Sequence, residues 1–388
     1  MIPQAISKIS NRVRFDRNEL AGAFGDIGTD LPLLIGILAA SGADTASVLV
    51  VYGLMQICSG LWYGMPMPVQ PLKAFAALVI ARKIQPAIIY GGGLSIGISM
   101  FLLSVTGLIN WLARIVPKAV VRGIQLGLGF QLATLALKEY VPAAGLPGYL
   151  LAGLCFVVAI ALWGNRKYPA AILIVVAGLL FSLVFHFATT TTSFQANIGV
   201  TLPQFHVPTP ADMLTGFFLL ALPQIPLSLG NSILATNQIV QDYYPQKNIN
   251  VKKISFTYSL MNLVSPFFSG IPVCHGSGGM VGHYTFGART GGSVIIYGSL
   301  YLITGLLFSR SFQELVQIFP MPVLGTLLFF EGLALTLLVR DVASAKEDLF
   351  IAVLVALVCI GLPYGYLVGL ILGTAIFYFL KKFRSQQF

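Results

Sequence analysis

The segment Met65-Pro-Met-Pro-Val-Gln-Pro-Leu-Lys-Ala74 interrupts an otherwise apolar part of the chain. Because proline lacks an amide proton and disfavours helix in the residue before it, we expect no regular helix here before about residue 70. A second interruption, Pro272-Val-Cys-His-Gly-Ser-Gly-Gly-Met-Val-Gly282, is rich in glycine. Each leads into a segment shorter than a normal membrane span, 68–82 and 276–290. The two segments predict two broken helices.

The composition around these interruptions is that of a membrane protein. Of the 388 residues, 56% are hydrophobic and 9% are charged, whereas a soluble domain has about 25% charged residues. Membrane helices tolerate the 40 glycines and 21 prolines. A soluble domain is therefore excluded, and a lipid bilayer, not nucleic acid, is the expected partner. The four cysteines have neither metal-site nor disulfide spacing, so we expect no metal and no cofactor.

Apolar stretches of about 20 residues, the length that crosses a bilayer, recur along the chain. They lie at 20–40, 45–64, 87–110, 119–138, 147–164, 168–188, 213–240, 253–269, 292–309, 315–338, 348–362 and 364–381. With the two short segments, they predict an all-α polytopic membrane protein of about 14 transmembrane segments. Because the number of segments is even, both termini are expected on the same side of the membrane.

The distribution of basic residues agrees with this topology. If the N-terminus is cytoplasmic, 18 of the 23 Lys and Arg residues fall inside, four fall outside, and Lys73 lies within a segment. The longest predicted loop, about 189–212, carries no Lys or Arg. We therefore expect a multi-pass protein of the cell membrane with cytoplasmic termini.

Two pairs of short motifs indicate an internal repeat. Gly64-Met-Pro-Met67 is similar to Gly270-Ile-Pro-Val273, 206 residues later, and Ile115-Val-Pro117 is similar to Ile318-Phe-Pro320, 203 residues later. Each half would hold seven segments. Because seven is an odd number, the second half would cross the membrane in the opposite orientation to the first. Paired interrupted segments in two inverted halves mark the binding site of a transporter. The pattern predicts a 7+7 inverted repeat with half-helices as its third and tenth segments.

Two half-helices that begin inside the membrane would form a site for an anion. Their first amide groups are free and carry a partial positive charge, and glycine lets a ligand approach the backbone. Lys73 would offset negative charge, and a polar stripe in 213–240 would add donors. The expected binding residues are Thr29, Val69, Gln70, Lys73, Gln224, Ser228, Asn231, His275, Gly276, Ser277, Gly278 and Gly279.

Other interpretations of these residues stay open. The interrupted segments could be two kinked helices packed through glycine and proline, and the polar stripe could join helices by hydrogen bonds. Ionisable groups at membrane depth are costly and usually functional. We take Asp26, Asp30, His275 and Glu331 as candidate proton carriers.

Four motifs resemble one known family. FGDIGTDLPLLIG (24–36), GMPMPVQPLKA (64–74), VPKAVVRGIQLGLG (116–129) and SGIPVCHGSGGMVGHYTFGARTGGS (269–293) are similar to those of MOT-type molybdate transporters. These transporters are a branch of the sulfate permease (SulP) superfamily. The resemblance implies a core domain of spans one to four and eight to eleven, a gate domain of the other six, and an oxyanion between the third and tenth segments. It also implies that Ser228 stands near the sequence position at which relatives commonly have a carboxylate in the eighth span.

The resemblance divides the chain further. It gives an N-terminal cytoplasmic segment (1–18), a core domain in two halves (19–112 and 213–309), a gate domain in two halves (113–190 and 310–382), an extracytoplasmic loop (191–212) and a cytoplasmic tail (383–388). We expect no removable signal peptide and no STAS domain.

Together these features predict a secondary active transporter, not an enzyme, that imports molybdate by alternating access. A dianion entering a cell opposes an inside-negative potential by about 4.6 kcal/mol per 100 mV, so we expect coupling to H⁺ or Na⁺. Sulfate or tungstate could replace molybdate as the substrate, an anion channel is a weaker alternative, and a homodimer is compatible with the sequence. An intramembrane hydrolase with Asp26 and Asp30 as acid and base lacks a second motif on another span.

Overall fold

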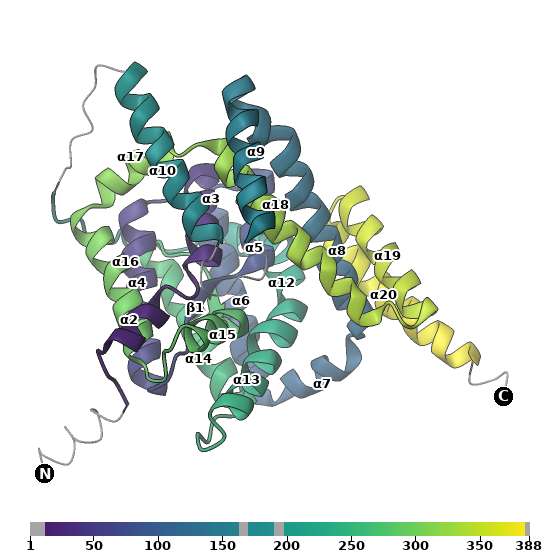
Figure 1. Cartoon of the computed structure of the whole chain (residues 1–388). Helices are drawn as coiled ribbons and strands as arrows, with labels where there is room; N and C mark the ends of the chain where they lie inside the picture. The colour runs from purple at the N-terminus through teal and green to yellow at the C-terminus, as the bar shows by residue number, and fades with distance from the viewer. Residues whose placement is uncertain (1–11, 163–169, 190–197, 385–388) are drawn as a thin grey trace, which may run out of the picture.

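The computed structural model describes residues 12–162, 170–189 and 198–384, and these are almost entirely helical. In the first part of the chain the helices are α2 (Arg17–Ala23), α3 (Ile27–Ser41), α4 (Thr45–Tyr63), α5 (Lys73–Arg82), α6 (Pro86–Thr106), α7 (Leu108–Ile115), α8 (Lys118–Leu135), η1 (Ala136–Tyr140), η2 (Val141–Ala144), α9 (Gly145–Ala161) and α10 (Ala170–Thr189). Figure 1 shows them as a bundle in which short α5 lies near the centre.

The second part of the chain also contains long and short helices. It contains α11 (Pro210–Gly216), η3 (Phe217–Ala221), α12 (Leu222–Leu227), η4 (Ser228–Leu234), α13 (Ala235–Tyr243), α14 (Val251–Val264), η5 (Ser265–Phe268), α15 (Ser277–Thr285), α16 (Gly292–Leu307), α17 (Ser309–Ile318), α18 (Met321–Leu337), η6 (Leu338–Val342), α19 (Lys346–Gly361) and α20 (Gly365–Arg384).

Each predicted span contains a helix, but three boundaries differ from the prediction. The span predicted at 315–338 begins at Met321, because Pro320 ends the separate helix α17, which bends 96° away from α16. The span predicted at 20–40 is broken into α2 and α3, which meet at 41°. The stretch after Thr106 turns at Gly107 (φ 73°) into the separate helix α7.

Six helices among the described residues are long and apolar enough to cross a membrane, or eight if each bent pair counts as one span. The longest of them, Lys118–Ala161 and Pro210–Tyr243, contain irregular turns. In the second, η3 and η4 are π-helical and flank Pro223 and Pro226. Wide turns of this kind accompany functional sites, because they change the direction in which side chains project.

The two interrupted segments meet at the centre of the bundle. Residues Val69–Pro71 form β1 and Val273–His275 form β2, and the two strands pair antiparallel with Gln70 opposite Cys274. The short helices α5 and α15, of 10 and 9 residues, begin within two residues of these strands. Both strands are buried over their whole length.

Side-chain amides satisfy the outer edges of both strands. Gln56 on α4 accepts a hydrogen bond from the Val69 amide and donates one to its carbonyl, at 2.8 and 2.7 Å. Asn262 on α14 makes the same two bonds to Val273, at 2.8 and 2.7 Å. Buried backbone groups without partners are costly, so these two side chains make the broken segments possible.

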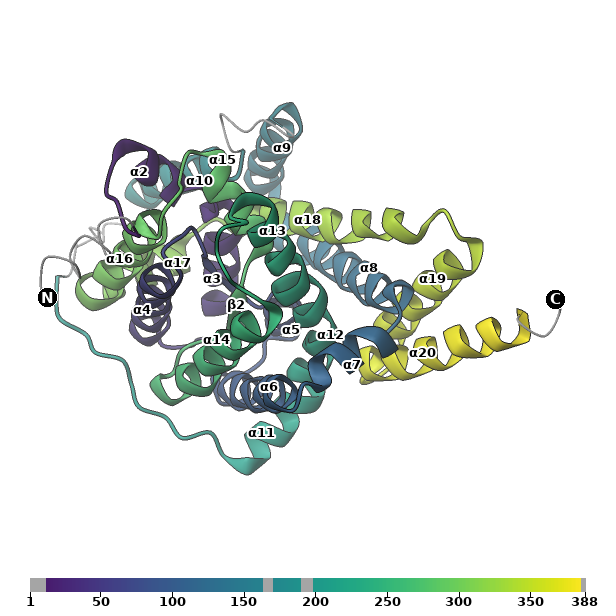
Figure 2. The ribbon, with the colours of Figure 1, turned by 90° about the horizontal axis from the view of Figure 1, so that it is seen from below.

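The helices form two groups (Figures 1 and 2). In one group α8 packs against α18, α19 and α20, and α9 packs against α18. In the other, α4 packs against α16, α6 against α14 and α11, and α3 against α5. Contacts of α5 with α8 and of α3 with α18 join the two groups, and the interrupted segments face this junction.

Helices α4 and α16 approach closely through glycine. A Cβ atom at Gly53 would lie 2.6 Å from the carbonyl oxygen of Gly298, and one at Gly60 would lie 2.7 Å from that of Gly291. Small residues allow this backbone contact, which is a common source of attraction between membrane helices.

We therefore expect Gly53→Ala to destabilise the protein by about 1–3 kcal/mol, because the added methyl group forces the two backbones apart. Thermal unfolding of the purified protein in detergent measures the effect. Gly153→Ala on α9 is the matched control, since a Cβ there has no neighbour within 4 Å. Equal melting temperatures for both variants would contradict the packing described here.

Candidate functional site

A cavity of about 400 Å³ lies between the two groups of helices, beside the starts of α5 and α15. Helices α8 and α18 close it on one side with Gln125, Leu128 and Glu331. Nine of the twelve predicted binding residues line it: Thr29, Gln70, Lys73, Gln224, Asn231, His275, Gly276, Ser277 and Gly278. The sequence motifs thus converge on one cavity.

The first turns of α5 and α15 point toward this cavity without side-chain caps. Helix α5 follows Leu72 and α15 follows Gly276, and neither of these residues supplies a side-chain acceptor to the helix. One α5 amide, that of Phe75, donates to Oε1 of Gln224 at 3.1 Å. The first amides of a helix have no acceptors in their own helix, so they are available to a ligand that accepts hydrogen bonds.

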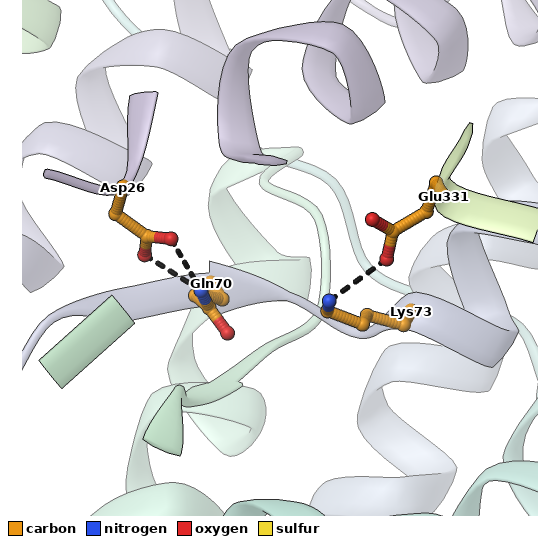
Figure 3. A network of polar contacts seen from close by, with 4 residues as sticks. All are labelled: Asp26, Gln70, Lys73 and Glu331. Carbon is orange, nitrogen blue, oxygen red and sulfur yellow. Dashed lines mark hydrogen bonds and ion pairs between the residues drawn. The ribbon is translucent and has the colours of Figure 1, made fainter. Parts of the chain in front are cut away.

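Glycine brings Gln70 and Asp26 together at the cavity wall. Nε2 of Gln70 donates to both carboxylate oxygens of Asp26, at 2.6 and 2.7 Å (Figure 3). A Cβ at Gly276 would lie 2.0 Å from Cδ of Gln70, and one at Gly279 would lie 2.1 Å from Oδ2 of Asp26. Larger residues at these two positions would displace the pair.

The break between α2 and α3 places Asp26 at the cavity. A Cβ at Gly25 would lie 2.5 Å from the carbonyl carbon of Gly282 in α15, so the chain bends where the two backbones touch. Asp26 follows as the residue before α3, and its side chain makes no hydrogen bond to that helix. The carboxylate is therefore directed to Gln70 instead of capping its own helix.

Lys73 is the one Lys or Arg residue among those that line the cavity in the described structure, and it is paired. Its Nζ lies 2.8 Å from Oε1 of Glu331 on α18, and the two side chains are 36% and 18% exposed (Figure 3). The sequence predicted Lys73 as a direct counter-charge for an anion. In the structure, the anionic partner of Lys73 is the Glu331 carboxylate, which belongs to the opposite helix group.

Three predicted binding residues do not line the cavity. Val69 is held by Gln56, and its carbonyl also accepts a hydrogen bond from the Tyr52 hydroxyl at 2.6 Å. The Ser228 hydroxyl lies 2.8 Å from that of Tyr258 and accepts a hydrogen bond from Gln224. It therefore joins α14 to the long helix Pro210–Tyr243. Gly279 lies behind the wall, against Asp26. Polarity and spacing alone could not distinguish these packing roles from ligand contacts.

The proton-carrier candidates lie in different surroundings. Asp26 and Glu331 line the cavity. Asp30 has no exposed surface, and its Oδ2 accepts hydrogen bonds from Tyr52 at 2.5 Å and Tyr297 at 3.4 Å. His275 is also fully buried, with Nε2 2.8 Å from Oγ1 of Thr257 and its ring against Tyr63, so its imidazole is turned into the protein.

Ten lining residues were not among the predicted ones: six are Ala or Leu, and the other four are Gly25, Gln125, Ser232 and Cys274. Gln125 is the most informative, because it is fully buried and its Nε2 has no hydrogen-bond partner among the described residues. Its isolation between apolar neighbours in span 119–138 was a signal available in the sequence. No group of three His, Cys, Asp or Glu side chains within the described ranges could hold a metal ion.

Comparison with known proteins identifies the family. A family model described as molybdate transporter of MFS superfamily matches residues 18–132 and 216–335. The chain belongs to this molybdate transporter family. It is 32% identical to molybdate transporter 2 of Arabidopsis thaliana over 95% of this chain and 88% of that protein. The resemblance found in the sequence motifs is thereby confirmed, and the family is one of transporters, not enzymes.

Solved structures with the same fold are members of the sulfate permease group. The chain matches the transmembrane domain of the cyanobacterial bicarbonate transporter BicA with a TM-score of 0.69 and 18% identity, over 94% of this chain and 99% of that one. It matches the murine anion transporter Slc26a9 in its inward-facing state with a TM-score of 0.70 and 10% identity, over 99% of this chain and 72% of that one. This family member is thus a helical, multi-pass membrane protein with the BicA and Slc26a9 fold.

The ion pair across the cavity gives a direct test of this geometry. We expect Lys73→Gln and Glu331→Gln to be non-additive in stability, because either one alone leaves a half-buried charge unpaired. The coupling energy should be about 1–2 kcal/mol, between that of exposed and of fully buried pairs. Melting temperatures of the two single variants and the double variant measure it, and strict additivity would show that the pair does not form.

Proposed function

We propose that this protein imports molybdate as a secondary active transporter and binds the oxyanion in the cavity between α5 and α15. The observation that carries the proposal is the convergence of two uncapped helix starts on one cavity of about 400 Å³. Helix N-termini bind tetrahedral anions through their free amides and partial positive charge. The family and the anion-transporter fold support the same substrate class.

Side chains at the cavity complete the proposed site. Ser277 begins α15, and Asn231 and Gln125 line the cavity beside it. Hydroxyl and amide groups of this kind donate hydrogen bonds to oxyanion oxygens. Lys73 supplies the positive charge once it is released from Glu331, and Gln70 can turn from Asp26 toward a bound oxyanion. Gln224 holds the start of α5 through the Phe75 amide, so its role is to position the helix.

We further propose a 7+7 inverted repeat of 14 segments, with α5 and α15 as half-helices that end at mid-membrane. The equivalence of Gln56 and Asn262 supports it. The two residues are 206 residues apart, the same offset as between the Gly-x-Pro motifs, and each holds the first residue of a strand. On this basis residues 19–112 and 213–309 form the core domain, and 113–190 and 310–382 form the gate domain. Both termini are cytoplasmic and the protein lies in the cell membrane.

Transport by alternating access requires the two domains to move past one another. Support comes from the position of the cavity between the two helix groups and from a second cavity, of about 310 Å³, that also includes Asn231. Lys118 and Arg122 line this second cavity at the start of α8, the end that the distribution of basic residues places in the cytoplasm. An oxyanion would leave the central cavity along this basic path.

Import needs an energy source. Moving a dianion into a cell at an inside-negative potential costs about 4.6 kcal/mol per 100 mV, so we propose coupling to an inward flow of H⁺ or Na⁺. Asp26 and Glu331 are the carboxylates that the cavity exposes to such an ion. Sulfate and tungstate share the charge and shape of molybdate and are the alternative substrates.

Transport by the purified protein in liposomes tests this function. With an imposed inward proton or sodium gradient, labelled molybdate should accumulate above its external concentration. Unlabelled molybdate should reduce this uptake more strongly than sulfate or tungstate does. Stronger competition by sulfate would make sulfate the substrate. Equilibration without accumulation would indicate a channel, and no movement of any of the three oxyanions would refute the proposal.

A substitution that displaces Gln70 should abolish this activity. Gly276→Ala places a methyl group where the Gln70 side chain lies, so we expect uptake at low molybdate concentration to fall at least about tenfold. Gly361→Ala is the control, because a Cβ at Gly361 meets no atom within 4 Å. Uptake by the Gly276→Ala protein equal to that of the control would remove Gln70 and α15 from the site.

A further inference from the structure

The charges that line the cavity oppose the binding of a dianion. His275 and Cys274 line the cavity, and so do three carboxylate or ammonium side chains among the described residues, Asp26, Glu331 and Lys73. With all three ionised, the cavity carries one net negative charge. Asp26 keeps a hydrogen-bonded partner in Gln70, whereas Glu331 is held by Lys73 at 2.8 Å. A dianion entering here must therefore compete with the Glu331 carboxylate for the single ammonium group.

We propose that Glu331 is the proton-binding site that couples oxyanion binding to proton uptake. A proton on Glu331 removes its charge, releases Lys73 to the oxyanion and takes away a repelling carboxylate. The oxyanion and the proton therefore favour each other's binding, and by linkage the effect is equal in both directions. This inference rests on the proposed transport of an oxyanion and specifies the residue for one proton, whereas at least two cations are needed to balance the charge of a dianion.

The position of the pair supports a role in the transport cycle. Lys73 is the first residue of α5, in one helix group, and Glu331 lies on α18, in the other. The ion pair therefore links the two groups across the cavity (Figure 3). An oxyanion that replaces Glu331 as the partner of Lys73 breaks this link, so ligand binding and release of the two groups become one event.

Several other titratable groups near α18 have partners among the described residues. On α8, Arg122 and Lys118 both pair with Asp341 of η6. Glu139 of η1 pairs with Lys83 at 3.6 Å, and Asp30 of α3 accepts a hydrogen bond from Tyr52.

The remaining titratable groups on the packed elements are basic, phenolic or a thiol. They are Lys138 and Tyr140 on η1, Arg340 on η6, and Tyr149 and Cys155 on α9. The described side chains of α10 include no titratable group. Asp26 is thus the second carboxylate that faces the cavity, and its oxygens are both occupied by Gln70. Glu331 is the group whose charge directly controls Lys73.

The test is the number of protons taken up when molybdate binds to the purified full-length protein. Calorimetry in buffers of different ionisation enthalpy counts them, and the slope of log Kd against pH gives the same number. For the wild type we expect close to one proton to be taken up at this site with each oxyanion, and affinity to fall from the lowest to the highest pH of the assay. For Glu331→Gln we expect no proton uptake from this site and binding at least about tenfold tighter at the upper pH.

Glu139→Gln is the matched control, because it makes the same chemical change at an exposed ion pair. It should retain the proton count and the pH dependence of the wild type. Wild-type binding without proton uptake, or an unchanged count in Glu331→Gln, would overturn this inference and leave oxyanion transport intact. Failure of the folded wild type to bind molybdate, sulfate and tungstate would instead refute the proposed function itself. If Glu331→Gln does not fold, the absence of proton uptake by the wild type still overturns the inference.

Discussion

Backbone that leaves a helix inside a bilayer must find hydrogen-bond partners within the protein, and the rest of this structure depends on how that constraint is met. Strands β1 and β2 satisfy each other on one edge, and Gln56 and Asn262 satisfy their outer edges. Because the strands are fixed in this way, α5 and α15 both begin beside one cavity. The free amides of two helix starts are thereby held in place before any ligand arrives, and binding does not have to order them.

The same arrangement joins binding to movement. The cavity lies where two groups of helices meet, and one ion pair, Lys73 with Glu331, crosses it. A ligand that needs the same ammonium group changes both the charge of the cavity and the connection between the groups. The chain belongs to a molybdate transporter family and has the fold of BicA, whereas the coupling proposed here rests on the side chains of this chain.

Much of this could be predicted from the sequence, because proline and glycine act locally. They located both interrupted segments and, together with polar residues of the spans at 20–40 and 213–240, indicated nine residues that line the cavity. The sequence did not indicate which residues make packing contacts, and Val69 and Ser228, both predicted to bind the ligand, contact Gln56 and Tyr258 in the structure. The pairing of Lys73 with Glu331, 258 residues apart, depends on tertiary structure, and so does the choice of Gln125 as a lining residue. The start of α18 was misplaced because Leu315, Val316 and Ile318, at the end of α17, run directly into the apolar stretch that follows Pro320.

The most direct test of the central claim is an experimental structure of the protein determined at saturating molybdate. The heavy metal atom gives strong density, so its position is unambiguous. The account predicts one oxyanion in the central cavity, within hydrogen-bond distance of the first amides of both α5 and α15, with Lys73 turned from Glu331 toward it. An oxyanion bound elsewhere, or contacting neither helix start, would contradict the account.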